Sequence, residues 1–293
     1  MPEGHTLHAL AGRLDRAFAG SPVAATSPQG RFAAGASRLD GTVLVGSSAW
    51  GKHLFVEFDG EVWLHVHLGL IGTFPVVPLP AELVGMPAAH LPVTGQVRLR
   101  LAGDGHVADL RGPNLCAVIT PAEVHAVEAR LGPDPLRGDA DPELGWSRIS
   151  NSRRPIGELL MDQAVIAGVG NVYRCEVLFR QRVNPFRPGQ EVRRTTWQKL
   201  WDDLSQLMRI GVAYNQILTM DDQVTEALGE VASGAAARHT PTLTGERLGD
   251  RYERRFYLYQ RAGEPCRVCG SWVRSVAAAG RTLYWCGRCQ RRR

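Results

Sequence analysis

The stretch CRVCGSWVRSVAAAGRTLYWCGRC, residues 266–289, holds four of the six cysteines in this 293-residue chain. Cys266 and Cys269 form one pair, and Cys286 and Cys289 form a second pair with the same spacing. Two such pairs, joined by a segment that reads as a hairpin, suit one tetrahedral zinc ion bound by thiolates. A redox or disulfide pair is the alternative, and the paired spacing disfavours it. We therefore expect a structural Zn²⁺ with no open coordination position.

The predicted hairpin between the two cysteine pairs carries Arg281 at its tip or on its flank. Arg281 is either an ordinary solvated charge or a planar guanidinium that grips a phosphate. The residue alone leaves both readings open, so its meaning depends on the rest of the chain.

Upstream lies RPIGELLMDQAVIAGVGNVYRCEVLFRQRVNP, residues 154–185, which reads as a helix, a glycine-rich turn and a second helix. Pro155 is expected to open the first helix. Asn171 is expected to cap the second helix, and Pro185 follows its end.

The turn between these helices, AGVGN at residues 167–171, contains Gly168 and Gly170. Backbone N–H groups that such glycines leave free at a helix N-terminus bind anions. A plain connection between two helices is the more common alternative. Nearby arginines favour the anion site, with a DNA backbone as its ligand: Arg153, Arg154, Arg174, Arg180 and Arg182.

Other segments complete the second half of the chain. We expect helices over 121–132 and 195–210, and a linker over 134–145. Residues 219–250 contain few large apolar side chains and predict a mobile loop. Residues 254–261, RRFYLYQR, predict a strand that leads to the cysteines.

The first half predicts an amphipathic helix followed by β-structure. Residues 5–19 place four large apolar side chains at helical spacing: Leu7, Leu10, Leu14 and Phe18. Residues 41–120 are rich in Val, Leu, Trp and Phe, and the Asp-Gly pairs at 59–60 and 104–105 mark turns. The chain is therefore predicted to be an α+β protein with more than one domain.

Composition narrows the possible partners. The formal net charge of +5 and the isoelectric point near 9.1 favour a polyanionic partner, although a mildly basic surface explains them equally well. Only two of the 34 basic residues are lysines, Lys52 and Lys199. We find no candidate membrane span and no signal peptide, so we expect a cytoplasmic protein with reduced cysteines.

The first residues, MPEG, permit an unusual chemistry. A short residue at position two lets the initiator methionine be removed, which leaves Pro2 with a free secondary amine beside the carboxylate of Glu3. Such an amine attacks an aldehyde-like carbon and forms an iminium, as lysine does in Schiff-base enzymes. An α-amine also has a lower pKa than lysine, and the positive end of a following helix favours its neutral form. Many proteins begin with these letters without consequence.

Taken together, these motifs resemble the Fpg/Nei family of base-excision DNA glycosylases, and particularly its endonuclease VIII-like (Nei) branch. The resemblance covers almost the whole chain, with the motifs in family order and at family spacing. It is carried by MPEG, GKHLFVEF, HLGLIGTF, LGPDPL, IAGVGNVYRCEVLF, GEPCRVCG and GRTLYWCGRCQ. Each motif alone is weak, but their combination is specific.

The resemblance implies an N-terminal β-sandwich with a leading helix, a helix–two-turns–helix domain and a zinc finger. We place these domains at 1–120, 121–255 and 256–293. DNA would lie in a cleft between the two halves, with the damaged base flipped out of the stack. Pro2 would attack C1′ of the sugar, the base would leave, and β- and δ-elimination would follow.

The resemblance also assigns roles to individual residues. Glu3 matches the glutamate that assists base release and sugar chemistry, and Lys52 matches a lysine that contacts phosphate near the lesion. Asn171 and Arg281 match residues that clamp the phosphates flanking the flipped nucleotide.

The chain departs from the family at several positions. Thr6 stands where many relatives have a second glutamate, so that carboxylate is absent. Leu70 occupies the position of the side chain that fills the hole left by the flipped base; packing in the sandwich core is the alternative. In DLRGPN, residues 109–114, Arg111 is retained, but Pro113 replaces a phenylalanine typical of the Fpg branch. Segment 213–255 matches relatives poorly.

We therefore expect a bifunctional DNA glycosylase/AP lyase that acts on oxidised pyrimidines in double-stranded DNA. Removal of oxidised purines is the first alternative. A damage-binding protein without catalysis is a second alternative, which the missing carboxylate at Thr6 motivates. A zinc-ribbon transcription factor is a third and ignores half of the chain. We expect a monomer associated with the nucleoid, without a membrane partner.

Overall fold

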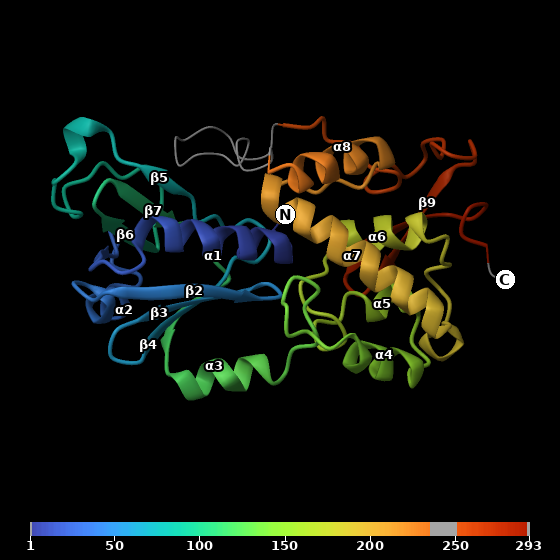
Figure 1. Ribbon diagram of the computed structural model, residues 1–293, viewed down its shortest axis with the longest axis horizontal. Coiled ribbons are helices and arrows are strands. Elements are labelled where there is room, and N and C mark those ends of the chain that lie inside the picture. Colours follow the sequence, from blue (N-terminus) through green and yellow to red (C-terminus); the bar gives the residue numbers. More distant parts are fainter. Residues whose placement is uncertain (1, 235–250, 292–293) are drawn as a thin grey trace. The chain divides into compact units, whose positions relative to one another are not determined.

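The computed structural model describes residues 2–234 and 251–291. The chain divides into two compact units, the first ending at Arg130 and the second beginning at Leu131. Each unit is described by itself below, with the elements labelled as in Figure 1. In the described residues, no helix is long and apolar enough to cross a membrane.

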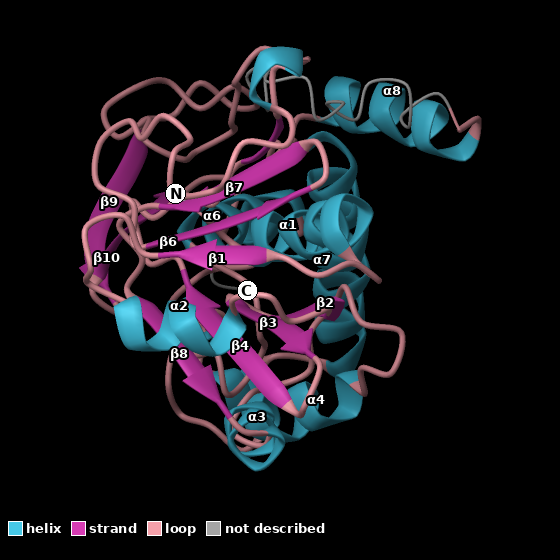
Figure 2. Cartoon of the chain, turned by 90° about the vertical axis from the view of Figure 1, so that its left-hand side faces the viewer, coloured by secondary structure: helices cyan, strands magenta, loops and turns pink. Residues whose placement is uncertain are grey.

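The first unit contains two antiparallel four-stranded sheets (Figure 2). The strand order is β1-β6-β7-β5 in one sheet and β2-β3-β4-β8 in the other. Their bounds are β1 Ala24–Thr26, β2 Leu44–Trp50, β3 His53–Phe58, β4 Val62–His67, β5 Val76–Pro78, β6 Leu99–Gly103, β7 His106–Leu110 and β8 Leu115–Ile119.

The leading helix is confirmed as α1 (Gly4–Phe18), which packs against β2 and β3. Its four predicted apolar residues are all buried, and they join side chains of both sheets in one core cluster. The predicted turns at 59–60 and 104–105 connect β3 to β4 and β6 to β7. The sequence reading missed β1, the short helix α2 (Ala33–Leu39) and the 3-10 helix η1 (Ala81–Leu83).

The second unit is helical, with a small sheet near its end. Helix α3 (Pro121–Glu128) still belongs to the first unit and is its last described element. The helices of the second unit are α4 Pro142–Ser150, α5 Ile156–Leu159, α6 Asn171–Arg180, the 3-10 helix η2 Gly189–Glu191, α7 Arg194–Tyr214 and α8 Asp221–Ala232. Side chains of α5, α6 and α7 pack into one apolar core that includes Tyr173, Trp197 and Leu204.

Two predictions about helices in this half are wrong. The expected linker contains the start of α4, which Asp141 caps by accepting a hydrogen bond from the N–H of Glu143 at 2.9 Å. The described part of the expected mobile loop contains α8, in which three side chains are buried, those of Gln223, Val224 and Ala227. The rest of that loop, residues 235–250, lies outside the described residues.

Residues 254–261 do not form the predicted strand. The reason is the buried carboxylate of Glu176 on α6, which accepts hydrogen bonds from the N–H groups of Tyr257, Leu258 and Tyr259 at 2.8–2.9 Å. These N–H groups point at a carboxylate rather than at a neighbouring strand. The segment is thereby held on α6 just before the first cysteine pair.

The segment between the cysteine pairs is a β-hairpin, as predicted. It consists of β9 (Val273–Ala278) and β10 (Arg281–Cys286), which pair in antiparallel register from Val273–Cys286 to Ala278–Arg281. Ala279 and Gly280 form the tip, and both have positive φ angles.

Candidate functional site

The residues singled out at the N-terminus lie at the start of α1. Glu3 is the residue that precedes the first turn of the helix, and it is fully buried. Pro2 is half-buried and stands directly before it. The first N–H groups of a helix carry partial positive charge. An amine on Pro2 therefore lies where a positive charge is disfavoured, next to a carboxylate that accepts protons.

The position of the missing carboxylate, Thr6, has a histidine for a neighbour. The hydroxyl of Thr6 lies 3.3 Å from Nε2 of His5. Burial, reinforced by the charge of the amino terminus, lowers the pKa of His5 to about 3. A neutral imidazole and a hydroxyl therefore lie side by side in the first turn of α1.

Lys52 lies at the tip of the tight turn that joins β2 to β3. Trp50 and His53 pair across the turn, so that only Gly51 and Lys52 connect the strands. Gly51 has a φ of 60°, as the first central position of a II′ turn requires. The sequence therefore places this lysine, one of two in the chain, at the corner of a sheet, where it is half-buried.

The question left open for Leu70 is settled in favour of exposure. Its side chain is 51% exposed, and that of Ile71 is 84% exposed. Both lie on a turn closed by the N–H of Gly72, which donates to the carbonyl of Leu68 at 3.0 Å. A Cβ on Gly72 would lie 2.2 Å from that carbonyl, so the turn requires glycine there. Two aliphatic side chains are thus presented to solvent.

Arg111 is used inside the first unit. Its guanidinium forms an ion pair with Asp109 at 2.7 Å and donates to the carbonyl of Thr94 at 3.2 Å. Asp109 also pairs with the buried Arg100, which holds the carbonyls of Leu91 and Pro92. These contacts make Arg111 a brace for the loop before β6, rather than a side chain that projects from the surface.

The start of α6 differs from the prediction in two respects. Gly170 precedes the first turn and Asn171 is the first helical residue, so Asn171 does not cap the helix. The N–H of Gly168 is not free, because it donates to Oε1 of Gln163 at 3.0 Å. Instead of facing solvent, the side chain of Asn171 is buried and donates to the carbonyl of Thr282 in the hairpin at 2.9 Å.

Most of the arginines that favoured an anion site have structural partners. Arg174 is fully buried and donates to Asn171, to Gly157 and to Ala278 of the hairpin. Arg180 pairs with Asp203 and Asp221, and Arg154 pairs with Glu158 and Asp162; Arg182 lies over the ring of Phe179. This cluster therefore does not support the anion site predicted at the glycine turn.

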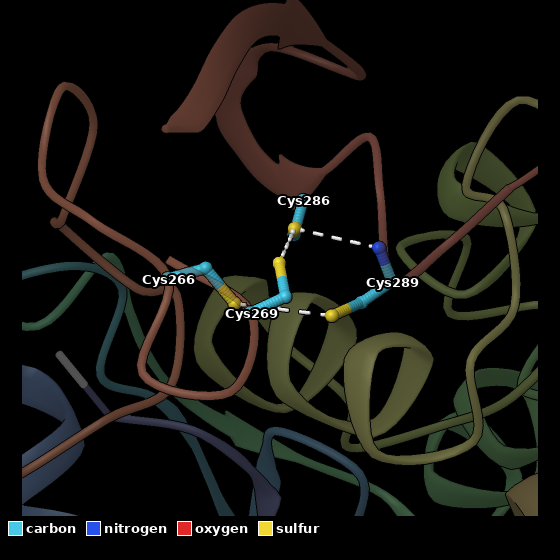
Figure 3. Close-up of side chains that lie close together, drawn as sticks. All are labelled: Cys266, Cys269, Cys286 and Cys289. Carbon is cyan, nitrogen blue, oxygen red and sulfur yellow. Dashed lines mark hydrogen bonds between the residues drawn. The ribbon is translucent and has the colours of Figure 1, made fainter. Parts of the chain in front are cut away.

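The four cysteines converge as the spacing predicts (Figure 3). Their sulfur atoms lie within 4.8 Å of one another, with 3.9 Å between Cys266 and Cys289 and 3.4 Å between Cys269 and Cys286. Zinc–sulfur bonds of about 2.3 Å in a tetrahedron place sulfur atoms about 3.8 Å apart. The four thiolates therefore form a site for one structural zinc ion.

Arg281 is the first residue of β10, directly after the hairpin tip, and it is exposed. Its guanidinium donates to the carbonyl of Gly280 at 3.1 Å. The zinc site lies at the other end of the hairpin, and the side chains of Asn171 and Arg174 hold its two strands to α6. The exposed guanidinium is thus carried by a well-anchored element.

Sequence reasoning missed two groups. Glu176 organises the segment before the zinc finger, and its only signal in the sequence was that it is the one acidic residue of the α6 segment. His53, His65 and His67 gather on one face of β3 and β4. The available signal was the alternation of His65 and His67 in LHVHL, together with His53 at the start of the preceding strand.

Comparisons with known proteins agree with this architecture. The formamidopyrimidine-DNA glycosylase N-terminal domain matches residues 1–114, the formamidopyrimidine-DNA glycosylase H2TH domain matches 131–222, and the zinc finger found in FPG and IleRS matches 263–292. The order of the three matches is the order of the sheets, the helical region and the zinc hairpin.

Similar proteins cover the full length of the chain. Endonuclease 8 1 of Mycobacterium tuberculosis is 49% identical over 99% of this chain and 100% of its own length, and a probable endonuclease 8 2 of Streptomyces coelicolor is 31% identical over 99% and 94%. The MutM (Fpg) protein of Thermus thermophilus has the same fold, with a TM-score of 0.72, 24% identity and coverage of 99% and 98%. The chain belongs to the Fpg/Nei family, the DNA glycosylases of base excision repair.

Proposed function

We propose that this protein is a bifunctional DNA glycosylase/AP lyase that removes oxidised bases, chiefly pyrimidines, from double-stranded DNA. Once Met1 is removed, the amine of Pro2 attacks C1′ of the damaged nucleotide and the glycosidic bond breaks. The resulting iminium acidifies the neighbouring C–H bond, so that the 3′ phosphate and then the 5′ phosphate are eliminated. Glu3 transfers protons at the base and the sugar.

The observation that carries this proposal is the start of α1. Pro2 stands before the positive end of a 15-residue helix, and the buried Glu3 is its neighbour. The helix end favours the neutral, nucleophilic form of the amine. Burial excludes water from the carboxylate, which strengthens its interaction with charge that develops on the sugar.

We assign DNA contacts to projecting side chains. Lys52 and Arg281 contact phosphates as cations, and Leu70 enters the stack where the damaged base leaves it. Asn171 supports phosphate binding by holding the hairpin that carries Arg281, since its amide is bonded to that hairpin. We assign no DNA contact to three other residues, which stabilise the fold instead: Gly168, Gly170 and Arg111. The enzyme acts as a monomer.

The preference for pyrimidines rests on the Nei-like features. The 49% identical relative is named an endonuclease 8, and Pro113 stands where the Fpg branch has a phenylalanine. Single-turnover excision from duplexes that contain thymine glycol or 8-oxoguanine tests this preference. Faster release of 8-oxoguanine would establish the oxidised-purine alternative.

The assignment of Glu3 is tested by measuring base release and strand cleavage separately. Glu3→Gln is expected to bind lesion DNA as well as the unaltered enzyme and to lose base release by about 100-fold or more. A matched change, Glu57→Gln on the sheet, should leave both steps unchanged. Weak binding combined with normal excision per bound complex would contradict the role of Glu3, and normal excision would favour a different proton donor.

A further inference from the structure

The first unit contains a row of three histidines that no step above uses. His53, His65 and His67 lie on the same face of β3 and β4, and we call them the histidine row. Nδ1 of His53 lies 2.8 Å from Nε2 of His65, which is a short hydrogen bond between imidazoles. The ring of His53 also lies 5.1 Å from that of His67, edge to face. Phe55 stacks on His65 at 4.8 Å and is fully buried.

The histidine row is neutral at physiological pH. Burial is the main cause that lowers the pKa of His53 to about 3 and that of His65 to about 4, and it also lowers the pKa of His67. The other groups that act on these imidazoles in the described chain are one another and the cations Lys52 and Arg130. Such surroundings oppose both a bound metal cation and a gained proton.

The histidine row lies beside two turns of the sheet, the Lys52 turn and the Leu70 turn. His53 follows Lys52 directly, so its ring fixes the strand end from which the Lys52 turn projects. His67 accepts a hydrogen bond at Nδ1 from the N–H of Gly69, 3.1 Å away, at the beginning of the Leu70 turn. Because β3 and β4 are antiparallel, the first residue of one strand lies beside the last residue of the other. The Lys52 and Leu70 turns therefore leave the same end of the sheet.

We propose that His53, through its hydrogen bond to His65, is a positioning residue that fixes the Lys52 turn relative to the Leu70 turn. This inference rests on the proposed function, in which Lys52 contacts phosphate and Leu70 enters the base stack. A flexible lysine tip could bind phosphate without placing Leu70 opposite the gap in the base stack. Two imidazoles joined at 2.8 Å, with Phe55 stacked behind them, remove that freedom before DNA arrives.

The test compares variants that remove or retain the hydrogen bond. His53→Leu and His65→Leu remove it, whereas the double variant His53→Asn, His65→Gln retains it, because Asn presents an atom near Nδ1 and Gln one near Nε2. His125→Leu, an exposed histidine on α3, is the control. We expect His53→Leu to weaken affinity for an abasic-site duplex about tenfold. The Asn/Gln pair should restore most of it, and His125→Leu should change nothing.

A double-mutant cycle separates positioning from general damage to the fold. If His53 acts through Lys52, then His53→Leu should have little further effect on affinity in a Lys52→Ala background, so the two losses should not add. A destabilised sheet would instead give additive losses and a lower melting temperature. Additive losses, or no rescue by the Asn/Gln pair, would overturn the positioning role. If Lys52→Ala alone left affinity unchanged, the phosphate contact in the proposed function would fail, and the positioning role would fall with it.

Discussion

The Lys52 turn of the first unit and the start of α6 in the second unit make an instructive pair. Each combines a glycine with a polar residue that family resemblance links to phosphate. At the β2–β3 turn, two residues join the strands and the lysine stands at the corner. At the start of α6, the side chain of Asn171 is turned inward and bonded to the zinc hairpin. Lys52 itself stands at a corner, whereas Asn171 supports the hairpin that carries Arg281.

The difference teaches that the surrounding chain decides how such a motif is used. A two-residue turn places its side chains at the end of the sheet, where Lys52 is only half-buried. The helix α6 is covered on all sides, and every residue from Asn171 to Phe179 is buried. Its polar groups must therefore find partners inside the unit, because an unpaired buried polar group costs about 1–3 kcal/mol.

The zinc site should produce the largest contrast between the units. Cys286→Ser removes one of four thiolates and is expected to release the metal, because so small a finger has little core of its own. Affinity for abasic-site DNA should fall about 100-fold or more as Arg281 loses its support. Hydrogen exchange should rise in β9 and β10 but not in the sheets of the first unit. Metal analysis that finds no stoichiometric zinc in the unaltered protein would contradict this account.

Two arginines that lie at the hairpin, Arg174 of α6 beneath it and Arg281 beside its tip, sharpen the comparison further. Arg174→Ala should destabilise the protein by about 2–4 kcal/mol, because it leaves buried acceptors without donors. Arg281→Ala should leave the melting temperature unchanged and lower the slope of log affinity against log salt by about 0.9, the effect of one phosphate contact. Calorimetry and binding titrations over a range of salt concentrations check both. A large loss of stability from Arg281→Ala would break the distinction.

Leu70 and Leu68 offer the same contrast within one turn. Leu68 is 3% exposed, so Leu68→Ala should cost about 2–5 kcal/mol of stability. Leu70→Ala should cost less than about 1 kcal/mol, because half of the side chain already meets water. It should slow excision from duplex DNA and spare cleavage of single strands, since only the duplex must be unstacked. Equal slowing on both substrates would contradict the proposal that Leu70 fills the gap left by the flipped base.

A smaller effect is expected from acid. The folded-state pKa values of His53 and His65, about 3 and 4, lie below the ordinary value of 6.5. Between these limits the unfolded chain binds protons that the folded chain does not, so stability should fall as the pH falls below 6.5. The melting temperature at pH 5 should be lower than at pH 7, and His65→Gln should reduce the difference. A melting temperature that rises on acidification would contradict this.

Much of the architecture could be predicted because its signals are local. The apolar period of α1, the Asp-Gly turns and the cysteine spacing each report on a few neighbouring residues, and each is confirmed. The exposure of Leu70 was left open, because leucines at strand ends usually belong to the core while the resemblance placed Leu70 in the DNA stack. The structure shows Leu70 half-exposed, on a tight turn that only a glycine at position 72 can close.

The errors share a physical cause in long-range contacts. Residues 254–261 have the composition of a strand, but a carboxylate some eighty positions away takes their N–H groups. Asn171 looks like a helix cap until the hairpin, 111 residues later, takes its amide. The helix α8 was missed because its buried face holds no large apolar side chain, only Gln223, Val224 and Ala227.

The central claim is the amine of Pro2, and reductive trapping tests it most directly. The protein is mixed with an abasic-site duplex and borohydride, and the cross-linked peptide is identified by mass spectrometry. We predict that the DNA remnant lies on the peptide that begins with Pro2, and that a protein with an N-terminal tag traps none. Because Lys52 and Lys199 are the only lysines, an adduct on either is easily recognised. Such an adduct, or equal trapping by the tagged protein, would contradict the account.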